Sequence, residues 1–270
     1  MTRERRKDAL FLGAGLLAVA FLPLVLGRGA SEAHRPSTPL LVAQAAVIAV
    51  ACVFAALCAW RFERGNPVRG SWSLLAVGLF VLTLGEATEA FYVVVRHLDD
   101  PFPSLADVFF LLAYPLLLAA FVTFVRAYRE SGFPVASRQS RFVAAAVATS
   151  AASGAAVLAP VLGSEAPLVE RLISGGYVVL DFVLLIPIFM LMRTTWRFRG
   201  GGIWKVWAGV LFGFVFTSVG DLFFAYFQAR PGGLFGLRGD QLDAVSDLMF
   251  LLSYLGIARG ALHQLELLQA

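Results

Sequence analysis

Residues Trp72 to Tyr114 read WSLLAVGLFVLTLGEATEAFYVVVRHLDDPFPSLADVFFLLAY, and residues Trp207 to Tyr254 repeat the main features of this stretch. In both copies, a glycine that precedes an acidic residue lies thirteen positions after the tryptophan. In both copies, an aspartate also lies seven residues before the final tyrosine. Landmarks that match in the same order predict two tandem copies of one unit.

The composition of the chain indicates its class. Hydrophobic residues make up 59% of the sequence and charged residues 15%, with a mean hydropathy of +0.78. Soluble domains carry roughly 25% charged residues. The apolar residues form long runs separated by short arginine-rich breaks. A positive-inside bias places arginines in such breaks, so the net charge of +4 does not indicate nucleic-acid binding. The sequence therefore predicts an all-α polytopic membrane protein.

About eight apolar runs are long enough to cross a bilayer, four in each copy. Their approximate bounds are 9–27, 39–60, 73–95, 105–125, 142–162, 168–192, 206–227 and 242–262. The first run also has features of a secretory signal, but its length and the repeat favour a retained span. The expected organisation is a basic N-terminal segment, two four-helix repeats and a short cytoplasmic tail, at 1–8, 9–134, 135–262 and 263–270.

The charges of the breaks alternate along the chain. The N-terminus and the breaks around Arg64, Arg129 and Arg197 are strongly basic, whereas the breaks between them are neutral or acidic. This alternation predicts that both termini are cytoplasmic in a plasma (inner) membrane. An even number of spans per copy gives the two copies the same orientation, so we expect a pseudo-twofold axis along the membrane normal.

Carboxyl groups inside the spans are the candidate functional residues, since each costs about 2.5–3.5 kcal/mol at the bilayer centre. The topology places most of them near the outer face. No lysine or arginine is expected deep enough in a span to neutralise them. They are therefore expected to be protonated, hydrogen-bonded to neutral groups, or available to a cation or amine. The expected ligand-binding residues, with two tyrosines included, are Glu86, Glu89, Asp107, Tyr114, Asp181, Asp221, Asp247 and Tyr254.

Most of these residues also have a structural interpretation. Ser104 and Asp107 have the spacing of a capping box at the start of a helix. Glu86 and Asp221 each follow a glycine at which two helices can touch, so they can be hydrogen-bonding groups of the helix contact. The two tyrosines are expected to be hydrogen-bond partners within the bundle. Asp181 is the hardest to explain structurally, because an acid at mid-span has no helix end to cap.

The sequence contains no recognisable catalytic or metal-binding set. His34, His97 and His263 fall outside the expected spans, which excludes axial haem ligation within the bundle. Cys52 and Cys58 lie in one apolar run and point to different faces of its helix. No Ser-His-Asp set, HExxH motif or phosphate-binding loop is present. We therefore expect no enzymatic activity, no cofactor and no metal.

The segment PSLAD at 103–107, followed by Tyr114-Pro115, resembles a part of known bacterial signalling proteins. It is similar to the N-terminal multi-span regions of proteins that carry diguanylate cyclase or phosphodiesterase domains (GGDEF and EAL types, in cyclic-di-GMP signalling) and sometimes of histidine kinases. Those regions also have an aspartate like Asp181, a pair like Gly220-Asp221 and a final helix like Asp247–Tyr254. The resemblance covers nearly the whole chain and implies a sensory input module of a bacterial inner membrane. In that family an output domain follows the last span, whereas this sequence ends soon after it, so an output partner is expected.

Three functional hypotheses follow. The first is a non-enzymatic sensor or regulator in which an outer acidic pocket between the repeats binds a small ligand, cation, amine or lipid headgroup. Ligand binding would shift the last span and signal to a cytoplasmic or membrane partner, with a homodimer allowed. The second is a small secondary transporter or proton-coupled carrier, which tandem repeats and intramembrane acids suit equally well. A weaker alternative is a membrane enzyme that acts on lipid, with Glu86 or Asp107 as acid–base groups.

Overall fold

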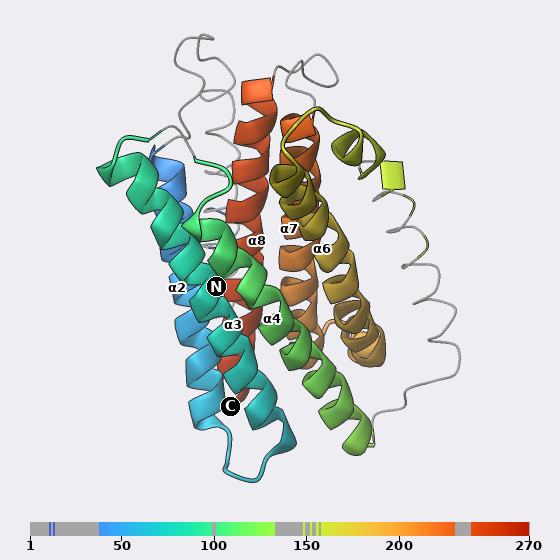
Figure 1. Cartoon of the computed structure of the whole chain (residues 1–270). Helices are drawn as coiled ribbons and strands as arrows, with labels where there is room; N and C mark the ends of the chain where they lie inside the picture. Colours follow the sequence, from blue (N-terminus) through green and yellow to red (C-terminus); the bar gives the residue numbers. More distant parts are fainter. Residues whose placement is uncertain are drawn as a thin grey trace.

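The computed structural model describes residues 38–98, 101–132, 158–229 and 239–269, together with a few single positions before and between these ranges. All regular secondary structure in these residues is helical. Two short segments continue a long helix: the π-helical η1 (Phe91–Val95) follows α3, and the 3₁₀ segment η2 (Trp196–Phe198) follows α6. The long helices are α2 (Thr38–Arg61), α3 (Pro67–Ala90), α4 (Leu105–Glu130), α6 (Leu168–Thr195), α7 (Gly202–Ala229) and α8 (Gly239–Leu267) (Figure 1).

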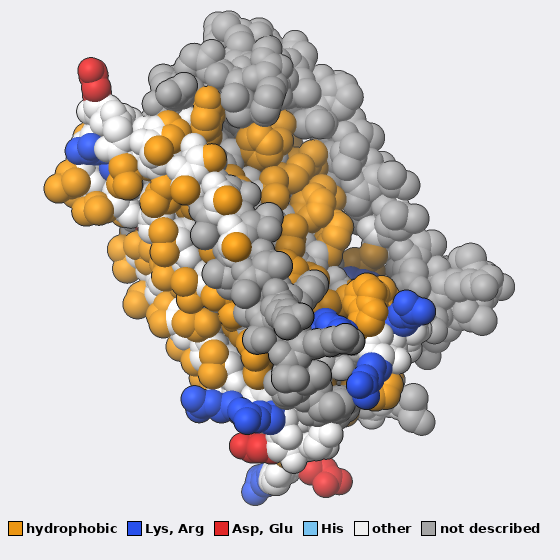
Figure 2. Space-filling view, turned by 90° about the vertical axis from the view of Figure 1, so that its right-hand side faces the viewer, with side chains coloured by type: hydrophobic (Ala, Val, Ile, Leu, Met, Phe, Trp, Pro, Cys, Tyr) orange, Lys and Arg blue, Asp and Glu red, His pale blue; other side chains and the backbone are white. Residues whose placement is uncertain are grey.

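Each of these six helices is long and apolar enough to cross a membrane. Large hydrophobic side chains such as Val53 and Phe80 are more than half exposed. Figure 2 shows hydrophobic side chains over the helices of one face, with Lys and Arg gathered toward the lower end. Apolar patches of this extent are rare on soluble monomers. The chain is therefore a helical, multi-pass membrane protein.

Six of the predicted spans coincide with the six described helices. The predicted first span (9–27) and the N-terminal segment (1–8) lie outside the described residues except for single positions, and so does most of the fifth span (142–162). The total of eight spans therefore stays a prediction. At the other end of the chain, α8 continues to Leu267, beyond the expected end of the eighth span at Leu262.

Local sequence signals set where two of the helices begin. The side chain of Asn66 accepts a hydrogen bond from the backbone N–H of Val68, and Pro67 occupies the first position of α3. Proline is suited to this position because the first N–H groups of a helix have no intrahelical acceptor. Ser104 and Asp107 form the predicted capping box at the start of α4.

The six helices form a closed ring in which each packs against two main neighbours. α3 lies between α2 and α4, and α7 lies between α6 and α8; contacts of α2 with α8 and of α4 with α6 close the ring. In the predicted repeat, α2, α3 and α4 correspond to α6, α7 and α8. The contact between α2 and α3 then corresponds to that between α6 and α7, and the contact between α2 and α8 corresponds to that between α6 and α4. A pseudo-twofold axis between two copies would produce this pattern.

The two ends of the ring differ in charge. One end contains the termini of helices next to Arg64, Arg129 and Arg197, and is called the arginine-rich end here. The opposite end contains the starts of α4, α6 and α8 and the ends of α3 and α7, and is called the acid-rich end because Glu86 and Asp107 lie near it.

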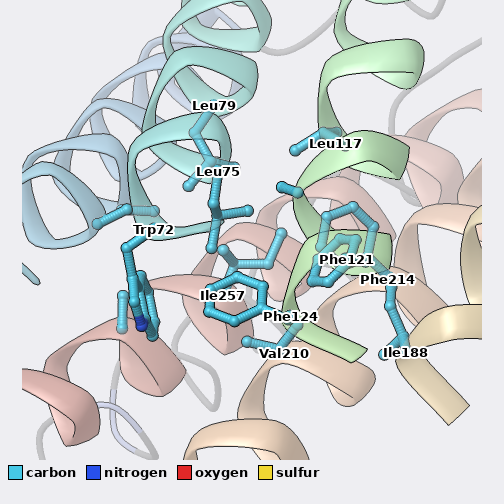
Figure 3. Packing of buried hydrophobic residues seen from close by; sticks show 14 of the residues in the cluster. Trp72, Leu75, Leu79, Leu117, Phe121, Phe124, Ile188, Val210, Phe214 and Ile257 are labelled. Atoms are coloured by element: carbon cyan, nitrogen blue, oxygen red, sulfur yellow. The ribbon is translucent and has the colours of Figure 1, made fainter. Parts of the chain in front are cut away.

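Aromatic side chains from both copies fill the half of the ring toward the arginine-rich end. Trp72 and Trp207 each meet the ring of Phe124 edge-on, with centroids 5.3 and 5.0 Å apart, and all three side chains are buried. The indole N–H of Trp207 donates to the hydroxyl of Tyr128 at 3.1 Å. Figure 3 shows Trp72 and Phe124 within this core, beside Phe121 and Phe214. The two tryptophans, which mark the start of each predicted copy, therefore both pack against Phe124.

The helices α7 and α8 are in backbone contact through two pairs of glycines. Gly209 and Gly213 of α7 face Gly256 and Gly260 of α8. A Cβ atom on Gly209 would lie 2.9 Å from the carbonyl oxygen of Gly256, and one on Gly260 would lie 2.7 Å from that of Val206. Glycines four residues apart on both helices allow this close approach in a membrane.

Candidate functional site

A cavity of about 100 Å³ lies among the helices at the acid-rich end. A cavity of this size holds more than one water molecule. It contains seven of the eight predicted ligand-binding residues; the eighth, Asp181, lies beside it and contacts Tyr114. The described residues that line the cavity come from both copies, and they are Gln44, Leu82, Glu86, Glu89, Pro101, Phe102, Ser104, Ala106, Asp107, Phe110, Tyr114, Tyr177, Thr217, Asp221, Phe224, Ser246, Asp247, Phe250 and Tyr254.

Two tyrosines at corresponding positions of the predicted repeat each reach an acid of the other predicted copy. The hydroxyl of Tyr114 in α4 lies 3.3 Å from Oδ2 of Asp221 in α7. The hydroxyl of Tyr254 in α8 donates to Oε1 of Glu86 in α3. In the predicted repeat, Tyr114 corresponds to Tyr254 and Asp221 corresponds to Glu86. The two contacts then correspond as well, and the cavity is lined by helices of both predicted copies.

Asp181 and Asp221 form a buried carboxyl pair. The hydroxyl of Tyr114 lies 2.8 Å from Oδ1 of Asp181, closer than it lies to Asp221, so its one hydrogen serves two acceptors. The shared hydroxyl therefore brings two buried carboxyl groups of different helices close together. Because two nearby buried carboxylates repel each other, the pair can hold a proton or accept a cation.

Asp107 combines its capping role with a contact across the ring. Its Oδ2 atom accepts the backbone N–H of Ser104 at 2.6 Å, which confirms the predicted capping box. Its Oδ1 atom accepts the hydroxyl of Tyr177 in α6 at 2.7 Å. Both interpretations of Asp107 therefore apply, because the carboxyl that closes the first turn of α4 also lines the cavity.

The glycine before each of the equivalent acids admits a phenylalanine ring. A Cβ atom on Gly220 would lie 2.8 Å from the ring of Phe250, and one on Gly85 would overlap the ring of Phe110. Both rings line the cavity. In each copy, the glycine therefore lets a ring pack against the helix, and the next residue presents its carboxyl to the cavity.

Polar contacts connect α8 to two other helices around the cavity. The side-chain N–H of Gln44 in α2 donates to the backbone oxygen of Asp247 at 2.6 Å. The hydroxyl groups of Thr217 in α7 and Ser253 in α8 lie 2.6 Å apart. α8 extends from the cavity to the arginine-rich end.

The charged side chains that line the cavity, among the residues that the structure describes, are all carboxyl groups. The hydrogen-bond donors to Asp107 and Asp221 are hydroxyl and backbone N–H groups, which carry no net charge. Within the same residues, no three His, Cys, Asp or Glu side chains are grouped so that they could hold a metal ion. The site is therefore negatively charged or protonated, and it is rich in aromatic rings.

A second group of charged residues lies in α8 toward the arginine-rich end. Nη1 of Arg259 is 3.5 Å from Oε2 of Glu266, and Nδ1 of His263 is 3.1 Å from the same oxygen. Both Arg259 and His263 are buried. His263 was expected past the eighth span, but α8 continues to Leu267 and includes it. This group lies far along α8 from the cavity, so it does not neutralise the acids there.

Sequence reasoning missed several residues of the site. Tyr177 precedes Asp181 by about one helical turn, which could have placed it on the same face of α6. Gln44 is a buried polar residue inside an apolar span, a signal as strong as that of the acids. In α8, the spacing of Arg259, His263 and Glu266 places them on one face of the helix.

No family model, curated protein or solved structure matches this chain. The resemblance to the sensory regions of bacterial signalling proteins stays a prediction, and the function is inferred from the geometry of the site.

Proposed function

We propose that the protein is a sensory or regulatory module of a bacterial inner membrane, built from two tandem four-helix repeats. It binds a small cationic ligand in the cavity at the acid-rich end and transmits binding through α8 to a partner at the arginine-rich end. The observation that supports this best is the convergence of the predicted acids from both copies on one cavity. Asp107 and Asp221 lie in different copies, yet both line it.

The charge distribution supports an outward-facing cavity. The arginine-rich end has many more Lys and Arg residues than the acid-rich end, where Arg96 and Arg171 are the described ones. Positive residues accumulate on the cytoplasmic side of membrane proteins. The proposal therefore places the cavity on the non-cytoplasmic side and the end of α8 in the cytoplasm.

The role of α8 rests on its contacts at both ends. Near the cavity it carries Asp247 and Tyr254, and it bonds to α2 through Gln44. Toward the opposite end it carries the buried Arg259, whose Nη1 lies 3.5 Å from Oε2 of the half-buried Glu266. A ligand that draws Asp247 or Glu86 toward itself changes the contacts that hold α8, and a packed helix moves as a unit.

The test combines a binding screen with a reporter on α8. Purified protein in detergent is screened by thermal unfolding with sodium chloride, small amines, polyamines and amino acids, and each hit is repeated on Asp221→Asn. Gln269→Cys then carries a fluorescent label just past α8. We expect stabilisation that requires Asp221 and a change in label emission on binding. Stabilisation without any change at the label would contradict transmission through α8, and no hit in the panel would contradict a cationic-ligand receptor.

A small secondary carrier is the second candidate. It is favoured by the equivalent contacts Tyr114–Asp221 and Tyr254–Glu86, because many carriers bind substrate between two structural repeats. The aromatic core around Phe124 separates the cavity from the arginine-rich end, so a carrier would have to open this core in each cycle. Uptake of a hit compound into proteoliposomes above that of empty vesicles would favour the carrier over the sensor.

A further inference from the structure

The buried carboxyl pair beside the cavity, Asp181 and Asp221, needs more hydrogen-bond donors than the hydroxyl of Tyr114 provides. Asp181 is only 2% exposed, and its Oδ2 atom is buried with no hydrogen-bond partner among the described residues. Its other oxygen shares the single hydroxyl hydrogen of Tyr114 with Asp221. A buried acceptor that is left without a donor costs about 1–3 kcal/mol, and more if it is charged. The pair therefore favours an occupant that brings hydrogen-bond donors or positive charge.

Asp221 connects this pair to the cavity. It bonds to Tyr114 on one side and lines the cavity on the other. A cation in the cavity can thus interact with Asp221 directly and with Asp181 through the shared hydrogen bonds. The other ionisable groups around the pair are Asp107 and Tyr114 of α4, Tyr177 of α6, Tyr254 of α8, and Glu86 and Glu89 of α3.

Aromatic rings surround the rest of the cavity. Phe224 lies one turn after Asp221 in α7, and its ring meets that of Phe102 edge-on with centroids 5.1 Å apart. Phe110 and Phe250 line the cavity as well. Aromatic faces stabilise organic cations by about 0.5–2 kcal/mol, and they also bury the apolar part of such a ligand. A hydrated metal ion gains little from such walls, and calcium prefers six to eight oxygen ligands.

Resting on the proposed function, we infer that the ligand is a small organic ammonium ion. Its nitrogen binds beside Asp221, where it offsets the negative charge of the Asp181–Asp221 pair, and its apolar substituent lies against Phe224 and Phe102. The volume of about 100 Å³ limits the ligand to a few non-hydrogen atoms beyond the ammonium group. The ammonium group can belong to a free amine or to the headgroup of a membrane lipid.

The experiment measures thermal unfolding of the purified protein in a non-ionic detergent. The probes are choline chloride, its uncharged analogue 3,3-dimethyl-1-butanol, and sodium chloride at the same ionic strength. We expect choline to raise the unfolding midpoint and the other two to leave it unchanged. Lowering the pH should weaken the effect of choline, because protons compete for the same carboxyl groups. Equal effects of choline and its uncharged analogue, or of choline and sodium, would overturn the ammonium assignment.

Two variants and a matched control locate the effect. Asp221→Asn should lower the apparent affinity for choline at least about tenfold, the change expected for a loss of about 1.4 kcal/mol in binding free energy. Phe224→Leu keeps every carboxyl group and should weaken choline binding about two- to fivefold, as expected for the loss of a cation–π contact of about 0.5–1 kcal/mol. The control Glu165→Gln removes an exposed acid outside the cavity and should respond like the parent protein. If Asp221→Asn does not fold, an unchanged choline affinity in Phe224→Leu still overturns the assignment.

Nanodiscs distinguish the two sources of the ammonium group. If the ligand is a lipid headgroup, phosphatidylethanolamine should raise the midpoint above that in phosphatidylglycerol, and Phe224→Leu should reduce the difference. If it is a free amine, choline should stabilise the protein equally in both lipids. If only the ammonium class fails, the wider screen still gives a hit such as sodium, whereas if the proposed function fails, it gives none.

Discussion

At the scale of single residues, the hydroxyl of Tyr114 is a hydrogen-bond donor shared by two acceptors. It lies between two buried carboxyl groups of different helices, so it holds α4 to both α6 and α7. We expect Tyr114→Phe to lower the free energy of unfolding by about 1–2 kcal/mol, because the acceptors stay buried without their donor. Equilibrium unfolding in detergent measures the change.

The control for this substitution is Tyr92→Phe, since Tyr92 lies half-buried in η1 outside the cavity. Its unfolding free energy should differ from that of the parent by less than about 0.5 kcal/mol, as for surface substitutions. Equal stability of Tyr114→Phe and the parent protein would show that the hydrogen bond contributes nothing to the fold.

Residues of the site differ in how far the sequence alone could identify them. Acids such as Asp181 and Asp221 are recognisable because a carboxyl group in a membrane span is costly and therefore rare. The contact of both with Tyr114 could not be derived, since it depends on how helices distant in sequence pack. Tyr177 was overlooked because a tyrosine in a span is common, and only its partner, Asp107, gives it a role.

At the scale of helices, the contact between α7 and α8 is the most sensitive to a change in size. A Cβ atom on Gly209 would lie 2.9 Å from three backbone atoms of α8, the carbonyl oxygen of Gly256 and the Cα and N atoms of Gly260. Backbone atoms cannot move aside as a flexible side chain can. We therefore expect Gly209→Ala to lower the free energy of unfolding by about 1–3 kcal/mol, the range for overpacked cores.

The matched control is Gly176→Ala in α6, where a Cβ atom would meet nothing within 4 Å. This variant should be as stable as the parent protein or more stable, since alanine is the better helix former. Both variants are compared by thermal unfolding in the same detergent. A loss of stability in Gly176→Ala as large as that in Gly209→Ala would mean that the helix contact is not the cause.

The helices themselves were the part that the sequence predicted best. Apolar runs locate the six described helices because a span must be long and lacks water to satisfy its backbone. Their ends extend further than the runs, since polar residues continue a helix where caps or partners allow it. α8 is the example: Arg259 and His263 interrupt its apolar pattern but are buried, and both contact Glu266.

At the scale of the whole molecule, the ring explains why one cavity collects residues from so many helices. The contacts of α2 with α8 and of α4 with α6 join the two predicted copies twice. Repeated landmarks in the sequence predict two copies but not how they pack together, because those contacts arise only between helices far apart in the chain. These two helix contacts place Tyr114 of one predicted copy beside Asp221 of the other, and Tyr254 beside Glu86.

The orientation of this ring in the membrane determines which compartment supplies the ligand. Glu63 is exposed in the connection between α2 and α3 at the arginine-rich end, and Glu165 is exposed before α6 at the acid-rich end. The positive-inside bias predicts that Glu63 is cytoplasmic. We therefore expect a membrane-impermeant maleimide to label Glu165→Cys in intact bacterial cells, and to label Glu63→Cys only after the membrane is permeabilised.

The parent protein is the control for this labelling, because its own Cys52 and Cys58 lie within the α2 span, one half-buried and one buried. It should remain unlabelled in both conditions. The opposite result, with Glu63→Cys labelled in intact cells, would turn the cavity toward the cytoplasm. The ammonium ligand would then come from inside the cell, and α8 would carry its signal outward, which would contradict the proposed direction of sensing.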